Sequence, residues 1–404
     1  MVLRQNKQIW TTALIVVMVL FSFRLFGYAG INDKIERYPV LFMVPLLVVS
    51  CWKQITRKTN DVYYKLIRLL LISWTLSMFM SWIFWNQSLY LSYTTTGYYM
   101  FFVIFFYFCK KKITRSSIEK LIVIFGWLYV ILWLYALYKV PEITFGLTED
   151  TVDNSDRGIL RINFVGRLSL VFAYFYYLNK CLTNKSKFSI ILASTLFVFI
   201  VLQVTRQLIL WAAVVTVIFI FLRAKKLAVF LAVLFAIFYT GISNIQFSDD
   251  TIVGSMINIS KLQAEGQLYE GEDPRVTEYK YFFSDYSKNI ITDVFGNGVP
   301  NINTSYGRYK AQQEMNGIYL SDVGYPSIYV FLGLIGLLVY VILFIRGTFQ
   351  KLPEELGYIN MFMAFMIPAN VAASWYMGAD TQLALAICVY LIYIYRNNPK
   401  LIER

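Results

Sequence analysis

About a dozen long apolar runs fill this chain, and the connections on one side of them are rich in Lys and Arg. Hydrophobic residues make up 58% of the 404 residues and charged residues only 15%. A soluble protein of this length needs far more polar surface, whereas a run of about 20 apolar residues crosses a bilayer as a helix. The chain is therefore predicted to be an all-α, polytopic membrane protein, with one integral membrane domain over residues 1–404.

Hydropathy predicts about twelve transmembrane helices, of which the second and the last are short. The first run follows Arg4 and Lys7, as in a signal peptide, but it contains Arg24 and lacks a small-x-small cleavage site. We therefore expect an uncleaved first span. The predicted spans are 9–29, 38–52, 69–90, 92–109, 121–140, 162–182, 188–205, 207–222, 227–245, 322–345, 358–377 and 380–395.

Basic residues fix the predicted orientation. Every cluster falls on the same side if both termini are cytoplasmic, as the positive-inside rule requires. The rule also explains most of the net charge of +13, and no basic soluble domain is left over to bind nucleic acid. The clusters are Lys53, Arg57, Lys58, Lys65 and Arg68; Lys110, Lys111, Lys112, Arg115 and Lys120; Lys185 and Lys187; Arg223, Lys225 and Lys226; Arg346 and Lys351; and Arg396, Lys400 and Arg404.

Residue types that are scarce or missing exclude several kinds of chemistry. The chain has no histidine and four cysteines, none of them in the long polar loop described next. This argues against a disulfide framework and a CxxC metal site, and it excludes His-ligated zinc, haem and a Ser-His-Asp triad. We expect no metal and no cofactor.

Two connections on the opposite, outer side are unusual. Residues 141–161 are acidic at first and end in Arg157 and Arg161. Residues 246–321 form one long polar loop, in which a short amphipathic helix is predicted after Pro274, with Asp273 as its N-cap. This helix should end before the turn signal at residues 296–298. An outer loop this long is more often functional than a mere connector.

Arginines near this outer membrane edge are the first candidate site residues. Arg206 lies in a tight hairpin between two apolar runs, and Arg275 lies at the start of the predicted loop helix. Guanidinium binds phosphate in a bidentate manner and stays charged at any working pH. The ordinary alternatives are a snorkelling interfacial Arg206 and a solvated loop charge at Arg275. Arg161 and Arg167 are further candidates for phosphate binding, and Arg167 is expected about one turn inside a span, where charge is costly.

A carboxylate is the natural candidate for a general base in a chain without histidine. Asp322 opens the predicted span that follows the long loop. The alternative reading is that Asp322 only caps this helix, where a negative charge is favoured. Asp380 and Glu314 are weaker candidates for the same role.

Three stretches together resemble the bacterial O-antigen polymerase/ligase superfamily of membrane glycosyltransferases. In this family an Arg follows a span, a large outer loop carries an Arg-bearing helix and a G-x-G turn, and the next span contains G-x-x-G. The resemblance covers the C-terminal half, while the first half matches in hydropathy only. The matching stretches are VTRQLILW with Arg206, DPRVTEYKYFFSDYSKNIITDVFGNGVPN with Arg275, and SDVGYPSIYVFLGLIGLL with Asp322 and Gly333-Leu334-Ile335-Gly336.

The resemblance implies metal-independent, inverting glycosyl transfer at the outer face of the bacterial cytoplasmic membrane. The substrates would be undecaprenyl-diphosphate-linked oligosaccharide repeat units, and a chain-length regulator protein is an implied partner besides the membrane lipids. Arg206 and Arg275 would stabilise the leaving diphosphate, and Asp322 would orient or deprotonate the acceptor hydroxyl. Ligases of the family place a His where Asp322 stands, which favours a polymerase. A ligase, a lipid-linked oligosaccharide transporter and a scaffold protein are the alternatives.

The predicted topology has a direct test. The long loop is expected outside and the Lys110–Lys112 cluster inside. An epitope tag inserted at Gly266 should therefore be labelled by an antibody in intact cells. A tag at Lys112 should be labelled only after the membrane is permeabilised. Labelling of both tags, or of Lys112 alone, would contradict the orientation.

Overall fold

The computed structural model describes residues 33–140, 142, 144, 162, 164–203, 205–223 and 274–402, except for the side chains of residues 33–38 and 40. Within these ranges the chain is all-helical and has no strand. The α-helices are α2 (Asp33–Ser50), α3 (Trp52–Ile55), α4 (Val62–Trp85), α5 (Leu89–Thr96), α6 (Ile104–Lys111), α7 (Arg115–Lys139), α9 (Arg167–Asn184), α10 (Lys187–Leu202), α11 (Arg206–Arg223), α14 (Pro274–Ser284), α15 (Ile290–Phe295), α16 (Ser305–Met315), α17 (Gly324–Phe349), α18 (Gly357–Ala369) and α19 (Ala379–Asn397). Short 3-10 helices are η2 (Gly97–Val103), η4 (Leu320–Asp322), η5 (Glu354–Leu356), η6 (Trp375–Met377) and η7 (Pro399–Leu401).

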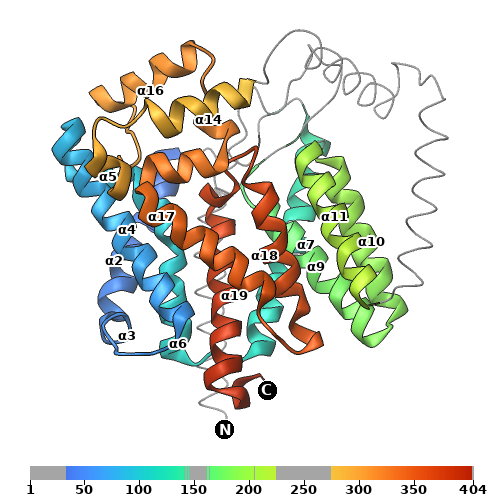
Figure 1. Cartoon of the computed structure of the whole chain (residues 1–404). Coiled ribbons are helices and arrows are strands. Elements are labelled where there is room, and N and C mark those ends of the chain that lie inside the picture. The colour runs from blue at the N-terminus through green and yellow to red at the C-terminus, as the bar shows by residue number, and fades with distance from the viewer. Residues whose placement is uncertain are drawn as a thin grey trace, which may run out of the picture.

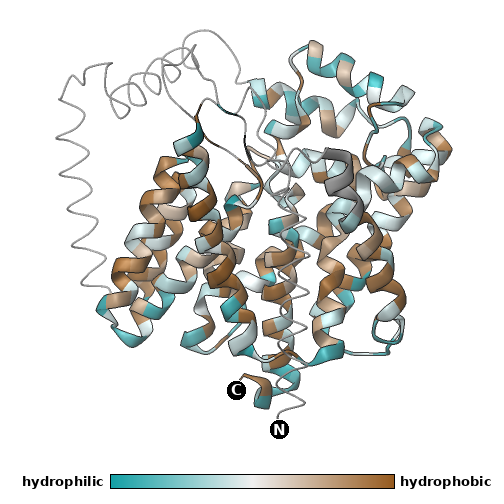
Figure 2. Cartoon of the chain, turned by 180° about the vertical axis from the view of Figure 1, so that it is seen from behind, coloured by the Kyte–Doolittle hydropathy of each residue, from teal (hydrophilic) through white to brown (hydrophobic). Residues whose placement is uncertain are grey.

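The long helices run side by side as a bundle, and the short helices α14 and α16 lie across one end of it (Figure 1). Four of the described helices, namely α4, α7, α11 and α17, are long and apolar enough to cross a membrane. Hydrophobic residues make up most of the helix bodies, and hydrophilic residues gather toward the two ends of the bundle (Figure 2). This confirms an all-helical chain with helices fit to span a membrane. The predicted total of twelve is not confirmed, because only these four of the described helices are long and apolar enough, and the predicted spans 9–29 and 227–245 lie outside the described residues.

Some helices carry an exposed apolar stripe, whereas others are buried. On α11 the large apolar side chains of Leu210, Val217 and Phe221 are about half exposed, and their spacing places them on one outward stripe. On α19, by contrast, every side chain from Ala379 to Ile394 is buried. A helix that is buried all round belongs at the centre of a bundle, and α19 packs against η2, α6, α9 and α4.

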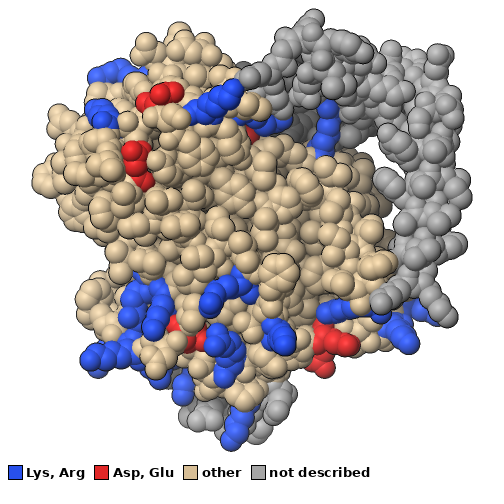
Figure 3. Space-filling view, viewed as in Figure 1, with Lys and Arg blue, Asp and Glu red and all other residues tan. Residues whose placement is uncertain are grey.

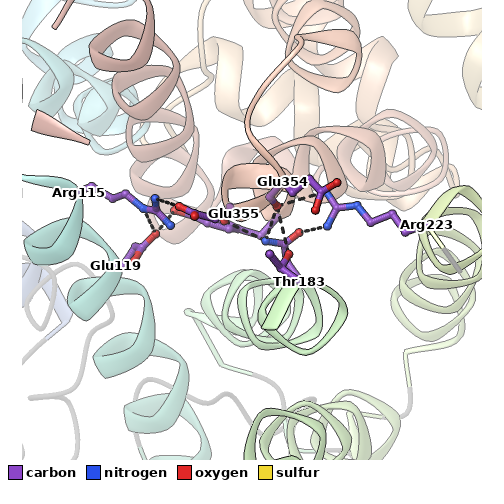
Figure 4. Close-up of polar contacts among 8 residues, drawn as sticks. Arg115, Glu119, Thr183, Arg223, Glu354 and Glu355 are labelled. Carbon is purple, nitrogen blue, oxygen red and sulfur yellow. Dashed lines mark hydrogen bonds and ion pairs between the residues drawn. The ribbon is translucent and has the colours of Figure 1, made fainter. Parts of the chain in front are cut away.

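Most Lys and Arg side chains on the face shown in Figure 3 form a belt at the end of the bundle opposite α14 and α16. We call this the basic end. Polar contacts there tie helices together (Figure 4). Arg115 on α7 donates from Nε to Glu119 at 2.6 Å and from Nη1 to Glu355 at 2.7 Å. Arg223 on α11 donates to the side chain of Asn179 on α9, which in turn donates to the carbonyl of Glu354 at 3.0 Å. The connection before α18 is thus held by α7, α9 and α11.

Two predicted elements differ from the observed ones because of local breaks. The predicted span 92–109 is divided into α5, η2 and α6, and polar residues such as Thr94 and Thr95 occupy its first part. The single helix predicted after Pro274 is two helices, α14 and α15, separated by residues 285–289. Pro274 does open α14, as predicted, and Asn289 caps α15 with a capping box. Asp273 lies outside the described residues.

We call residues 274–322 the cap. The cap is joined to the bundle where α17 is interrupted. Gly333 has φ +69 and ψ −173 inside α17, a conformation open to glycine alone. The interruption leaves the carbonyls of Val330 and Phe331 without helical partners, and the amides of Asn297 and Gly298 donate to them at 2.8 and 3.1 Å. The side-chain amide oxygen of Asn297 accepts from Trp85 Nε1 at 2.9 Å. The predicted turn at 296–298 is therefore a plug between α4 and α17.

This plug generates a prediction about stability. Asn297→Ala removes a buried side chain that bonds both Trp85 and Val330, and it should lower the free energy of unfolding by about 1–3 kcal/mol. Gly333→Ala should cost more, because a Cβ there would lie 2.3 Å from the carbonyl oxygen of Val294. Thermal unfolding in detergent, followed by thiol labelling of the buried Cys51 and Cys388, measures both. Asn303→Ala, at an exposed position of the same loop, is the control. Equal melting of all variants would contradict the role of the plug.

Candidate functional site

The connection between α18 and α19 is the centre around which the candidate residues lie. The helix α18 ends at Ala369, with Asn370 as its C-cap, before the end of the predicted span 358–377. The Asn370 carbonyl accepts from Tyr325 N at 3.0 Å and its side-chain oxygen accepts from Tyr376 N at 3.1 Å. Because Asn370 is fully buried, these bonds fix the connection against the start of α17.

Arg167 packs directly on this connection. Its guanidinium carbon lies 4.8 Å from the centre of the Trp375 ring, a cation–π distance, and Nη1 donates to Thr205 Oγ1 at 3.3 Å. The buried Asp380 interacts electrostatically with Arg167 and accepts from the Leu168 amide at 2.8 Å. The helix that carries Arg167 begins later than the predicted span 162–182. Gly166, with φ +114, ends the preceding segment, so Arg167 is the first residue of α9.

Arg206 is the first residue of α11 and follows Thr205, the hydroxyl partner of Arg167. The starts of α9 and α11 therefore lie together, and two arginines belong to the same small region. The side chain of Arg206 is exposed. Figure 3 shows a few cationic side chains at the cap end, well separated from the belt at the basic end.

Arg275 lies in the first turn of α14, which is attached to the same region by its next turn. Glu278 accepts from the Tyr319 amide at 2.9 Å, and the Tyr279 hydroxyl donates to the Val371 carbonyl at 2.6 Å. Burial raises the pKa of Tyr279 to about 12, so this donor stays protonated at physiological pH. Residues three and four apart share one face of a helix. Arg275 is accordingly on the α14 face that meets the 371–374 connection.

Asp322 ends the 3-10 helix η4, two residues before α17 begins at Gly324. Its carboxylate is exposed and accepts from the Ser321 hydroxyl at 3.0 Å. The turn is held by Ser374, whose amide donates to the Ser321 carbonyl at 3.0 Å and whose hydroxyl donates to the Leu320 carbonyl at 2.7 Å. Since Trp375 follows Ser374, one short segment carries both the contact to Asp322's turn and the platform for Arg167.

A cavity of about 430 Å³ opens beside these residues, within the size range of about 300–1,000 Å³ that is usual for small-molecule sites. Its walls come from α5 and η2, from α16, from η4, and from the residues flanking Arg167 and Asp380, namely Val165 and Gly378. Glu314, a candidate from the sequence, lines it together with Lys310, and the two form an ion pair of 2.6 Å.

The candidates thus fall into a connected set and a remainder. Arg167, Arg206, Arg275, Asp322 and Asp380 belong to segments joined through the α18–α19 connection, and Glu314 lines the neighbouring cavity. Arg161 lies outside the described residues.

Sequence reasoning missed Trp375, Ser374 and Lys310, and also the cavity wall of α5 and η2. The sequence feature that could have pointed to Trp375 is an indole within an apolar run that resembles a continuous span. The feature that could have pointed to the α5 wall is the pair of threonines, Thr94 and Thr95, within an aromatic stretch.

The described residues contain no group of three or more Cys, Asp or Glu side chains that could hold a metal ion. The side chains that the site brings together carry guanidinium, carboxylate, hydroxyl and aromatic groups. A scan against models of known protein families and a search of curated proteins found no match for this chain.

Proposed function

We propose that the chain is a polysaccharide polymerase, an inverting glycosyltransferase that joins polyprenyl-diphosphate-linked oligosaccharides. The observation that carries the proposal is the gathering of Arg167, Arg206, Arg275 and Asp322 on segments tied to one connection, beside a cavity of ligand size. The chemistry of these groups matches a reaction whose leaving group is a diphosphate and whose nucleophile is a hydroxyl.

The proposal includes an orientation. With the basic end in the cytoplasm, as the positive-inside rule requires, the cap lies on the outer face of a bacterial cytoplasmic membrane crossed by about twelve helices. A lipid-linked donor would enter sideways, with its undecaprenyl chain in the bilayer and its diphosphate at the headgroup level. The starts of α9 and α11 lie at the cap end of the bundle, as does α14, which is the level that this geometry needs.

In the proposed step, the bond between the anomeric carbon of the growing glycan and the diphosphate oxygen breaks. The electron pair leaves with the lipid diphosphate, and a hydroxyl oxygen of the incoming repeat unit bonds to the same carbon from the opposite face. Arg206 and Arg275 would neutralise the charge that develops on the diphosphate, as preorganised donors do in electrostatic catalysis. Arg167 is held between Trp375 and Thr205, and its positive charge would further stabilise the diphosphate.

Asp322 would receive the proton of the attacking hydroxyl or orient it. Its carboxylate is exposed and is bonded by Ser321, so a substrate hydroxyl has access to it. Asp380 is less suited to this role, because it is buried and its Oδ2 accepts from the Leu168 amide. A protein that sets chain length is the partner that a polymerase of this kind would need.

Arginine variants test the diphosphate site. Arg206→Ala and Arg275→Ala should each reduce polymer formation by about 10²–10³-fold, the usual effect of removing one transition-state donor. Lys at either position should also be impaired, since a point charge does not reproduce the bidentate fork. The measurement is the glycan ladder of a polymerase-deficient strain of the source organism that expresses each variant. Arg308→Ala, at an exposed position on α16, is the control and should give a full ladder.

The same strain distinguishes the alternatives. A ladder restored by wild type and collapsed to a single repeat by Arg206→Ala supports the polymerase. Lipid-linked polymer that forms without the protein but is never attached to its acceptor would show a ligase. Repeat units that accumulate on the inner face would show a transporter. Long-chain glycan from an Arg→Ala variant would remove that arginine from the site.

Asp322→Asn tests the base. The amide is isosteric and still accepts from Ser321, so the turn should fold, while proton acceptance is lost. We expect polymer formation to fall by about 10²-fold or more, with unchanged protein level in the membrane. A normal ladder would show that Asp322 is only a polar turn residue.

A further inference from the structure

The lining of the cavity beside the positively charged arginines carries no net charge among the described residues. The only charged side chains among the described residues that line it are Lys310 and Glu314, and they neutralise each other in a 2.6 Å ion pair. A diphosphate therefore gains little by entering it. The rest of the wall combines hydroxyl groups of Thr94, Thr95 and Ser321 with aromatic rings from η2 and with aliphatic side chains such as those of Leu41 and Val299. Hydroxyls, a balanced ion pair and aromatic faces suit an uncharged, hydroxyl-rich ligand.

The ion pair itself is unusual for a purely helix-stabilising contact. It joins Lys310 and Glu314 in the order Lys-then-Glu along α16, the less stabilising orientation of an i,i+4 pair. Both side chains are about one-third exposed, so the pair contributes little to stability. The carboxylate can accept from one ligand hydroxyl while the ammonium donates to the next, which matches two neighbouring hydroxyls of a sugar ring.

The position of this pair is fixed by aromatic packing of the cap on α4. Tyr306 stacks on Trp85 at 4.1 Å, and Tyr309 shares a hydrogen bond of 2.8 Å with Tyr281. Lys310 directly follows Tyr309 in α16. A site on such a supported element is held in place before its ligand arrives.

The cavity also has the right neighbours. Ser321 lies in its wall, and the next residue is the proposed base, Asp322. Val165 and Gly378 also line it, and they lie two residues from Arg167 and Asp380 in the sequence. A ligand in the cavity would present its outermost hydroxyl between the base and the arginines.

From these observations we infer that the cavity is the acceptor-sugar subsite, which holds the uncharged non-reducing-end sugars of the incoming repeat unit. Lys310 and Glu314 are its specificity-determining residues, because they bind neighbouring hydroxyls. This inference rests on the proposed polymerase function for the name acceptor, but the binding of sugar itself does not depend on catalysis.

The experiment uses the full chain in nanodiscs and, as its probe, the lipid-free oligosaccharide released by mild acid from the source's own lipid-linked repeat unit. This probe lacks the diphosphate, so it reports the cavity alone. Saturation-transfer NMR titrations should show binding to wild type. Glu314→Gln and Lys310→Met should each weaken it by about tenfold or more, the effect of losing a hydrogen bond to a charged group.

Two further variants separate recognition from folding. Lys310→Glu combined with Glu314→Lys keeps an ion pair on α16, so the cap should fold, but the reversed pair should still bind the probe about tenfold more weakly. Arg206→Ala should bind the probe as wild type does, because the arginine serves the diphosphate. Unchanged affinity in both single variants, or equal loss in Arg206→Ala, would overturn the subsite.

The outcome is distinguishable from that of the proposed function. Suppose that wild type binds the probe and the single variants do not, but that wild type fails to restore a glycan ladder in the polymerase-deficient strain. The sugar subsite is then supported and the polymerase function is contradicted. If wild type makes a ladder but Glu314→Gln and Lys310→Met bind and polymerise normally, the polymerase stands and this assignment falls.

Discussion

The cap stays on the bundle because α17 is broken at Gly333. The two carbonyls freed by the break belong to the buried residues Val330 and Phe331. A buried carbonyl without a hydrogen-bond partner destabilises the fold. The Gly296–Gly298 segment supplies the missing amides, and glycine is required on both sides. A Cβ at Gly296 would lie 2.2 Å from the Phe331 carbonyl oxygen. The two irregular segments therefore need each other, and the cap is part of the membrane fold.

Because the cap is joined to α17 in this way, both ends of the cap are positioned against the α18–α19 connection. The cap begins at α14, which reaches the α18–α19 connection through Tyr279, and it ends at η4, which reaches the same connection through Ser374. The arginines of α9 and α11 approach from the other side, where Trp375 receives Arg167. One connection of fewer than ten residues thus links the proposed base, the proposed phosphate clamp and the cap. Its rigidity, from the buried Asn370, matters because a displacement of about 1 Å can cost 10²-fold in rate.

The helical class could be predicted from the sequence, and the candidate arginines could be selected from it as hypotheses. A charge such as Arg206 between two apolar runs is conspicuous, because few charges are tolerated within a membrane. The helical class can be predicted because the apolar patterns of a helix and of a membrane span lie within about 20 consecutive residues. What could not be predicted depends on contacts between distant segments. Asn297 reads as a turn residue, and only its pairing with Trp85, 212 positions away, shows that it is a plug. The wall at Thr94 and Thr95 reads as part of a span, since hydropathy averages over the break at η2.

The joint between the cap and α17 also sets the order in which the chain can assemble. Trp85, Asn297 and Val330 must meet, and the first of these is synthesised more than two hundred residues before the last. Contacts so far apart in sequence form late and slowly. The cap therefore has no finished docking surface until α17 has been synthesised and has joined the bundle. A chain truncated before α17 would keep the packing of Tyr306 on Trp85 but would leave Phe283 of α14 without Tyr329, the ring on α17 that it packs against at 5.0 Å.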